Sequence, residues 1–69
     1  MYNRQNILNP VQSFQLFCIE SYRSEQGISG LKALNDFKQA GVFDHLASGY
    51  EVLHTQSKKY LIAEISEFI

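Results

Sequence analysis

The residues best placed to do chemistry lie in one short segment near the end of the chain, GYEVLHTQS, residues 49–57. It holds Tyr50, His54 and Thr55, and the four-residue spacing puts Tyr50 and His54 on one face if the segment is helical. Catalysis needs several reactive groups in mutual contact, and the neighbouring carboxylate, Glu51, has no second acid or base beside it in the sequence. The segment therefore predicts a corner in which His54 either bonds a helix-end carbonyl or contacts a partner.

The other reactive side chains are scattered along the chain. Cys18 falls on the apolar side of an expected helix without a cation nearby, which predicts a buried, inert thiol; a nucleophile would need a neighbour that lowers its pKa. His45, next to Asp44, is expected to be exposed or to cap a helix. Cys18, His45 and His54 are too widely spaced in the sequence to predict a metal site, so we expect no metal and no cofactor.

The sequence also lacks a glycine-rich phosphate loop and a nucleophile elbow. A helical unit of 69 residues is expected to leave no room for a ligand pocket of about 300 Å³ or more. An enzyme is therefore the least expected class, and we assign no catalytic residue.

Length and composition favour a single domain that packs densely or binds a partner. A chain of 69 residues forms one domain, and a domain this small buries only about 60% of its unfolded surface. The hydrophobic core of so small a domain contributes little stability, and small domains gain the rest from disulfides, metals, dense packing or partners. One cysteine excludes an intrachain disulfide, whereas 45% apolar and 13% aromatic residues suit the last two solutions.

The net charge and the hydropathy of the sequence limit the cellular location and the kinds of partner that we expect. The formal net charge is −1, and basic residues are scattered apart from Lys58 and Lys59, which argues against nucleic acid as the partner. No apolar run approaches the ~20 residues of a membrane span, and the N-terminus does not resemble a secretory signal. We expect a cytoplasmic protein that does not bind a membrane.

The first helix is expected over about 10–25. Asn9 can cap its free amides, Pro10 suits the first helical position, and Gly27 suits a left-handed end. Residues 1–8 are expected to form a flexible N-terminal tail and 9–69 a single small helical domain.

This first helix carries an apolar arc wider than one neighbouring helix covers. The arc comprises Val11, Phe14, Phe17, Cys18, Ile19 and Tyr22, with Leu16 beyond it. It fits a central helix wrapped by the other three, or a face shared with another chain.

A second helix is expected over 30–40, capped by Ser29 and ended by Gly41. Its expected apolar face is Leu31, Ala33, Leu34, Phe37 and Ala40, and its expected polar face is Lys32, Asn35, Asp36 and Gln39.

One or two short helical turns are expected within about 43–54. Asp44 can cap the first, residues 42–48, while residues 50–53 fit a helical turn or an extended connector. Ser57 begins a last helix over about 58–69 whose apolar end is expected to dock on the core. Its apolar stripe is Leu61, Ile62, Ile65, Phe68 and Ile69, and Glu64 and Glu67 line its polar side. The predicted fold is therefore all-α, a small bundle of three main helices.

The pattern of the whole chain resembles a group of short bacterial proteins of unknown function. The opening, NPVQSFQLFCIESYRSEQGISGLKALNDF, is similar to their N-P…F…E-x-Y…G-x-S/G…F start. The close, GYEVLHTQSKKYLIAEISEFI, is similar to their Y-x-x-LHT…Y-I-x-x-D/E-I-x-x-[FYL]-I ending. The resemblance covers residues 7–69. Glu64 stands where the group commonly has Asp, and Gln56-Ser57 stands where a glycine is frequent.

Members of that group are often encoded beside a larger protein that resembles an ADP-ribosyltransferase, in an arrangement like a toxin–antitoxin pair. The resemblance implies a small accessory or antitoxin-like binder, and it implies no catalytic residues.

Three functions stay open. The leading hypothesis is a protein-interaction module, because the apolar face is large for so small a chain; its candidate contacts are Tyr22, Tyr50, His54 and Tyr60. The alternatives are a helix-turn-helix DNA-binding regulator, which the lack of Arg and Lys in 42–48 disfavours, and a homodimer that pairs its first and last helices.

Overall fold

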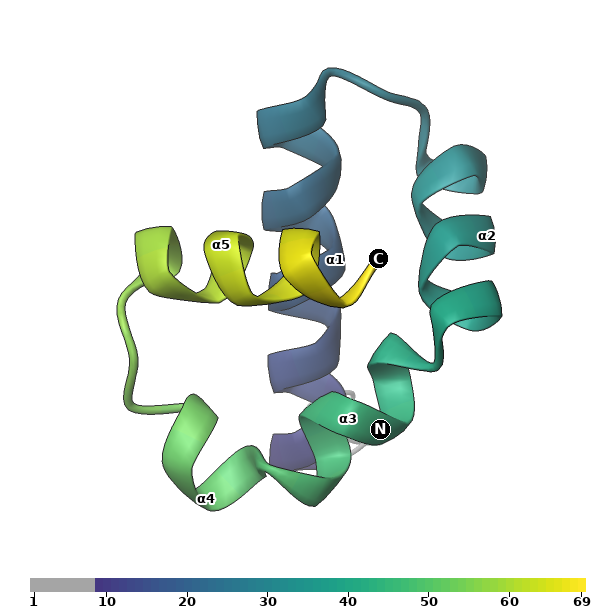
Figure 1. Ribbon diagram of the computed structural model, residues 1–69. Helices are drawn as coiled ribbons and strands as arrows, with labels where there is room; N and C mark the ends of the chain where they lie inside the picture. The colour runs from purple at the N-terminus through teal and green to yellow at the C-terminus, as the bar shows by residue number, and fades with distance from the viewer. Residues whose placement is uncertain (1–8) are drawn as a thin grey trace, which may run out of the picture.

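The computed structural model describes residues 9–69, and these form five helices without a strand (Figure 1). The helices are α1 (Pro10–Gln26), α2 (Gly30–Ala40), α3 (Val42–Ser48), α4 (Tyr50–Leu53) and α5 (Lys58–Phe68). The predicted all-α class is confirmed. The segment that fitted either a helical turn or a connector is the helical turn α4. The predicted N-terminal tail lies outside the described residues.

Local capping residues set the ends of α1 as predicted. The Asn9 side chain accepts a hydrogen bond from the backbone N–H of Gln12 at 2.8 Å. The Gln12 side chain accepts one from the backbone N–H of Asn9 at 3.2 Å. This reciprocal pair satisfies two amides that the first turn leaves free. At the other end Gly27 adopts the left-handed conformation, with φ 66°.

The later helices also begin at the predicted serines. The Ser29 and Ser57 hydroxyls each accept a backbone hydrogen bond at 3.1 Å, from Lys32 and Tyr60. Gly41, with φ 72°, ends α2 and leads directly into α3. The prediction that Asp44 caps α3 is wrong, because Gly41 occupies the cap position and no side chain bonds the first turn.

Helix α1 is the centre of the fold. In Figure 1, α2 runs back beside α1, α5 crosses α1, and α3 lies at the end of the fold opposite the α1–α2 loop, where it contacts both α1 and α2. All five helices contribute to the core, whose residues are Phe14, Cys18, Tyr22, Ala33, Phe37, Val42, Leu46, Leu53, Leu61 and Ile65. The central-helix interpretation of the broad α1 arc is therefore correct for most of that arc.

The margins of the predicted apolar faces lie in solvent. Phe17, expected inside the α1 arc, is 48% exposed, and Leu16 beyond it is 50% exposed. On α2, Leu31 is 77% and Leu34 39% exposed. The prediction that these two leucines belong to the face of α2 that packs on the core is therefore wrong. The physical reason is that α2 meets its neighbours through Ala33 and Phe37, on the adjacent side of its axis.

Helix α5 buries Leu61 and Ile65, whereas its last turn docks less deeply than predicted. Phe68 is 43% and Ile69 46% exposed. Phe68 lies against α3 by stacking on the ring of His45. The last turn of α5 therefore leaves apolar surface uncovered.

The turn between α3 and α4 generates a first prediction. A Cβ at Gly49 would lie 2.9 Å from Leu53 Cδ1, and Leu53 is buried. Gly49→Ala is therefore expected to lower the free energy of unfolding by about 1 kcal/mol, because a packed side chain must move. Chemical denaturation measures this.

Gly30→Ala is the matched control. A Cβ there would meet Arg23 Cδ at 3.8 Å, an ordinary contact, so stability should hold or rise by less than about 1 kcal/mol. Equal losses in the two variants would contradict the packing explanation.

Candidate functional site

The Tyr50–His54 corner is a closed structural unit. The two rings stack with centroids 4.3 Å apart, and Phe14 meets Tyr50 edge-on at 5.6 Å. His54 Nδ1 lies 2.6 Å from the Tyr50 carbonyl oxygen, and a carbonyl only accepts, so Nδ1 carries the hydrogen. The Thr55 hydroxyl donates to the Val52 carbonyl at 2.8 Å. The predicted bond from His54 to a helix-end carbonyl is present, and its contact with a partner stays a prediction.

The four predicted contact residues do not form one surface. Tyr50 and His54 come together on α4, but Tyr22 is 7% exposed and donates from its hydroxyl to Asp36 Oδ2 at 3.4 Å. Burial, together with the Asp36 carboxylate, raises the pKa of the Tyr22 phenol. Tyr60, on α5, is 47% exposed. Within residues 9–69 no hydrogen bond or ring contact joins Tyr22 or Tyr60 to the α4 pair.

His45 neither lies free in solvent nor caps a helix, so that prediction is wrong. Its Nε2 lies 2.9 Å from Glu64 Oε2, and its ring stacks on Phe68 with centroids 4.3 Å apart. The contact ties α3 to α5 across the fold. Glu64 was expected only to line the polar side of its helix. No periodicity in the sequence pairs residues this far apart.

Cys18 is buried as predicted, with no exposed surface. Burial raises the pKa of its thiol to about 11. At neutral pH the side chain is therefore an uncharged thiol that packs as a small apolar group.

The described part of the chain holds no group of three or more His, Cys, Asp or Glu residues that could bind a metal ion. None of its helices is long and apolar enough to cross a membrane.

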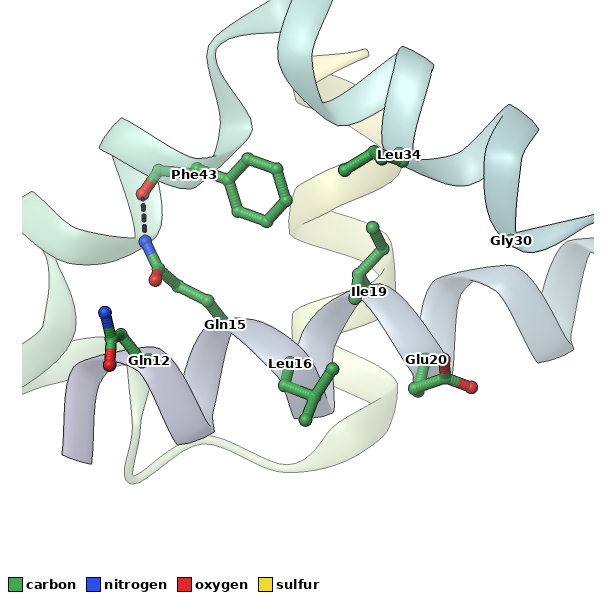
Figure 2. A pocket seen from close by; sticks show the side chains of 8 residues that line it. All are labelled: Gln12, Gln15, Leu16, Ile19, Glu20, Gly30, Leu34 and Phe43. Carbon is green, nitrogen blue, oxygen red and sulfur yellow. Dashed lines mark hydrogen bonds between the residues drawn. The ribbon is translucent and has the colours of Figure 1, made fainter. Parts of the chain in front are cut away.

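An open apolar groove of about 430 Å³ lies between α1, α2 and α3 (Figure 2). Its lining residues are Gln12, Gln15, Leu16, Ile19, Glu20, Gly30, Leu34 and Phe43. A hollow of about 500 Å³ also lies beside Glu25, Lys58, Lys59 and Ile62. The expectation that so small a chain leaves no room for a hollow above about 300 Å³ is therefore wrong.

The groove has apolar walls and polar ends. Figure 2 shows the Phe43 ring and the Leu34 side chain pointing toward one another above Ile19. At one end the Gln15 amide donates to the Phe43 carbonyl at 2.9 Å, which joins α1 to α3. At the other end Glu20 pairs with Arg23 at 3.0 Å. The groove can therefore hold apolar side chains, and its polar groups offer no acid–base pair.

Sequence reasoning missed this groove, although its signal was present. Leu16 lay beyond the arc assigned to α1, and Leu34 belonged to the expected apolar face of α2, where the structure leaves it 39% exposed. Both leucines line the groove. Neighbouring helices can cover only part of the circumference of a helix. Apolar residues that lie outside that part indicate such a surface.

The burial of Cys18 predicts slow thiol chemistry. Native protein at pH 8 should react with Ellman's reagent far more slowly than unfolded protein, because the thiolate is scarce and the sulfur is covered. The absorbance change with and without denaturant measures both rates. Equal rates in the two conditions would show that the thiol is accessible.

The α4 corner predicts a stability effect for His54. His54→Ala removes a hydrogen bond and a ring stack, so we expect it to lower the free energy of unfolding by about 1 kcal/mol and to retain the helical content. Thermal denaturation followed by circular dichroism measures this. Lys59→Ala, an exposed change on α5, is the control; identical stability in all three proteins would contradict a structural role.

Comparison with known proteins places the chain in a family. No curated protein and no solved structure matches it. The family described as "Protein of unknown function (DUF3791)" matches residues 13–69. That range includes most of α1, all of α2 to α5 and every groove residue except Gln12. The resemblance to a family of unknown function is thus confirmed: the chain belongs to the DUF3791 family.

Proposed function

We propose that this chain is a protein-interaction module and that the groove between α1, α2 and α3 is its binding surface. One observation carries the proposal: two exposed leucines line an open apolar groove that no other part of residues 9–69 covers. Leu16 is 50% and Leu34 39% exposed. Leu31, 77% exposed, lies one turn from Leu34 on the same helix.

Physical chemistry favours a protein as the occupant. Covering apolar surface contributes about 25 cal/mol for each Å² removed from water. Protein interfaces combine an apolar centre with a polar rim, and here Gln12, Gln15 and Glu20 supply such a rim. An open groove between helices suits the apolar face of an amphipathic helix.

The same groove offers little to a reaction. Its titratable side chain is Glu20, which already pairs with Arg23 at 3.0 Å. General acid–base catalysis needs a second group within hydrogen-bond reach of the substrate. Binding is therefore the function that this geometry supports best.

The family resemblance suggests which protein binds. The resemblance in the sequence implies a co-encoded, ADP-ribosyltransferase-like neighbour. We propose that this neighbour is the partner and that the chain acts on it as a cytoplasmic, antitoxin-like accessory. The exposed residues among the earlier candidates, His54 and Tyr60, stay predicted secondary contacts.

The helix-turn-helix alternative receives little support from the structure. Helix α3, its recognition segment, buries Val42 and Leu46 and holds His45 against Glu64. Its exposed side chains include Asp44 and no Arg or Lys. Reading of base edges and phosphates requires the opposite charge.

Co-expression with the ADP-ribosyltransferase-like neighbour tests the proposal. We expect the two proteins to copurify, and we expect Leu16→Glu to weaken the complex by about tenfold or more, because it places a carboxylate in an apolar interface. Affinity capture followed by calorimetry measures the loss.

Val52→Glu is the matched control, since Val52 is 66% exposed and lies on α4, outside the groove lining. It should bind as the unmodified chain does. Failure of the two proteins to copurify would overturn the proposed partner. Equal losses of affinity in the Leu16 and Val52 variants would overturn the proposed surface.

A further inference from the structure

We infer that the end of α5 controls the shape of the groove through α3. His45 on α3 contacts Glu64 and Phe68 on α5, and we call this the α3–α5 contact. It sets how far the ring of Phe43, two residues before His45, reaches into the groove. None of the three residues of the α3–α5 contact lines the groove itself. The inference rests on the proposed role of the groove as a binding surface, and it adds a regulation of that surface.

Helix α3 lies on the core through one face. The side chains of that face, Val42 and Leu46, are four residues apart and have no exposed surface. An α-helix turns by about 100° for each residue, so Phe43 lies about 80° to one side of the middle of this face and His45 about 80° to the other. Phe43 and His45 therefore flank the buried face of α3 on opposite sides.

A polar contact holds each flank of α3. On the Phe43 side, the Gln15 side chain donates to the Phe43 carbonyl at 2.9 Å and ties α3 to α1 (Figure 2). On the other side, His45 Nε2 donates to Glu64 Oε2 at 2.9 Å, because a carboxylate only accepts, and the His45 ring stacks on Phe68. Apolar burial is non-directional, so these flanking contacts fix the rotation of α3 about its own axis.

Rotation of α3 moves the Phe43 ring within the groove. The ring forms a wall of the groove and points toward Leu34 above Ile19 (Figure 2). Its centroid lies 5.2 Å from that of Phe37. Aromatic pairs are favourable over centroid separations of about 4.5–7 Å, so the contact with Phe37 allows the Phe43 ring to shift. Loss of the α3–α5 contact therefore frees α3 to rotate and changes the shape of the groove.

The α3–α5 contact is the part of this linkage that opens most readily. The side chains of His45 and Glu64 are 29% and 31% exposed, so water competes for their hydrogen bond. Phe68 is 43% exposed and lies in the last turn of α5, beyond the buried Leu61 and Ile65. Local openings occur where few apolar contacts are buried. The end of α5 can therefore detach while the core contacts of α3 and α5 stay in place.

Nuclear magnetic resonance of the free chain tests the linkage without any partner. The side chains of Ile19 and Leu34 lie beside the Phe43 ring in Figure 2, so ring currents make their methyl resonances sensitive to its position. Glu64→Ala removes the hydrogen bond of the α3–α5 contact and leaves every groove residue unchanged. We expect this variant to shift both sets of methyl resonances.

Glu67→Ala is the matched control, because Glu67 is an exposed carboxylate on the same helix and forms no ion pair within residues 9–69. It should leave the methyl resonances of the groove in place. His45→Ala should shift them in the same direction as Glu64→Ala does. The double variant should shift them no further than His45→Ala alone, because both changes break one contact. Circular dichroism checks that every variant is folded.

Binding to the ADP-ribosyltransferase-like neighbour measures the consequence for function. Glu64→Ala should weaken the complex by about threefold or more, although Glu64 lies outside the groove, because α3 is no longer held in one position. Glu67→Ala should bind as the unmodified chain does. Shifted methyl resonances with an unchanged affinity would overturn the regulation of binding.

The outcomes separate this inference from the proposed function. Methyl resonances that stay in place in both Glu64→Ala and His45→Ala, in a chain that copurifies with the neighbour, overturn the linkage and leave the partner proposal standing. Shifted resonances in a chain that does not copurify support the linkage and overturn the proposed partner. Equal shifts in Glu64→Ala and Glu67→Ala would also overturn the inference, because they would show a general effect of charge on α5.

Discussion

The burial of one aromatic ring, Phe37, underlies the rest of this structure. Phe37 has no exposed surface, and its ring centroid lies 5.5 Å from that of Tyr22 on α1 and 5.2 Å from that of Phe43 on α3. Three helices therefore meet on one side chain. Phe43 is only partly buried by this contact, and its remaining surface forms a wall of the groove. The core and the candidate binding surface are consequently two sides of the same aromatic cluster.

Size explains why apolar surface remains outside that cluster. A domain of 69 residues has too little volume to enclose the apolar residues of a 45% apolar composition. Few polar contacts join distant helices: Gln15 to the Phe43 carbonyl, Tyr22 to Asp36, and His45 to Glu64. A partner that covers the leucines beside the groove would add stability as well as function, because binding to the folded state alone shifts the folding equilibrium.

The two histidines show how position decides the role of one residue type. His54 lies four residues after Tyr50 and bonds the carbonyl at its own helix end, a contact within reach of its neighbours in the chain. His45 faces another helix and pairs with Glu64. The first role was predictable because the geometry of one helical turn is fixed. The second depends on how α5 crosses α1 and α3.

The sequence by itself determined the helices and most of their ends. Caps at Asn9, Ser29 and Ser57 and left-handed glycines at 27 and 41 act over three or four residues, so local chemistry specifies them. Only the tertiary structure decided which part of each apolar face is covered. Leu16, Phe17 and Leu31 are as apolar as the buried residues, and they differ only in the direction from which neighbouring helices approach. The groove exists because that direction is set by packing between residues far apart in the chain.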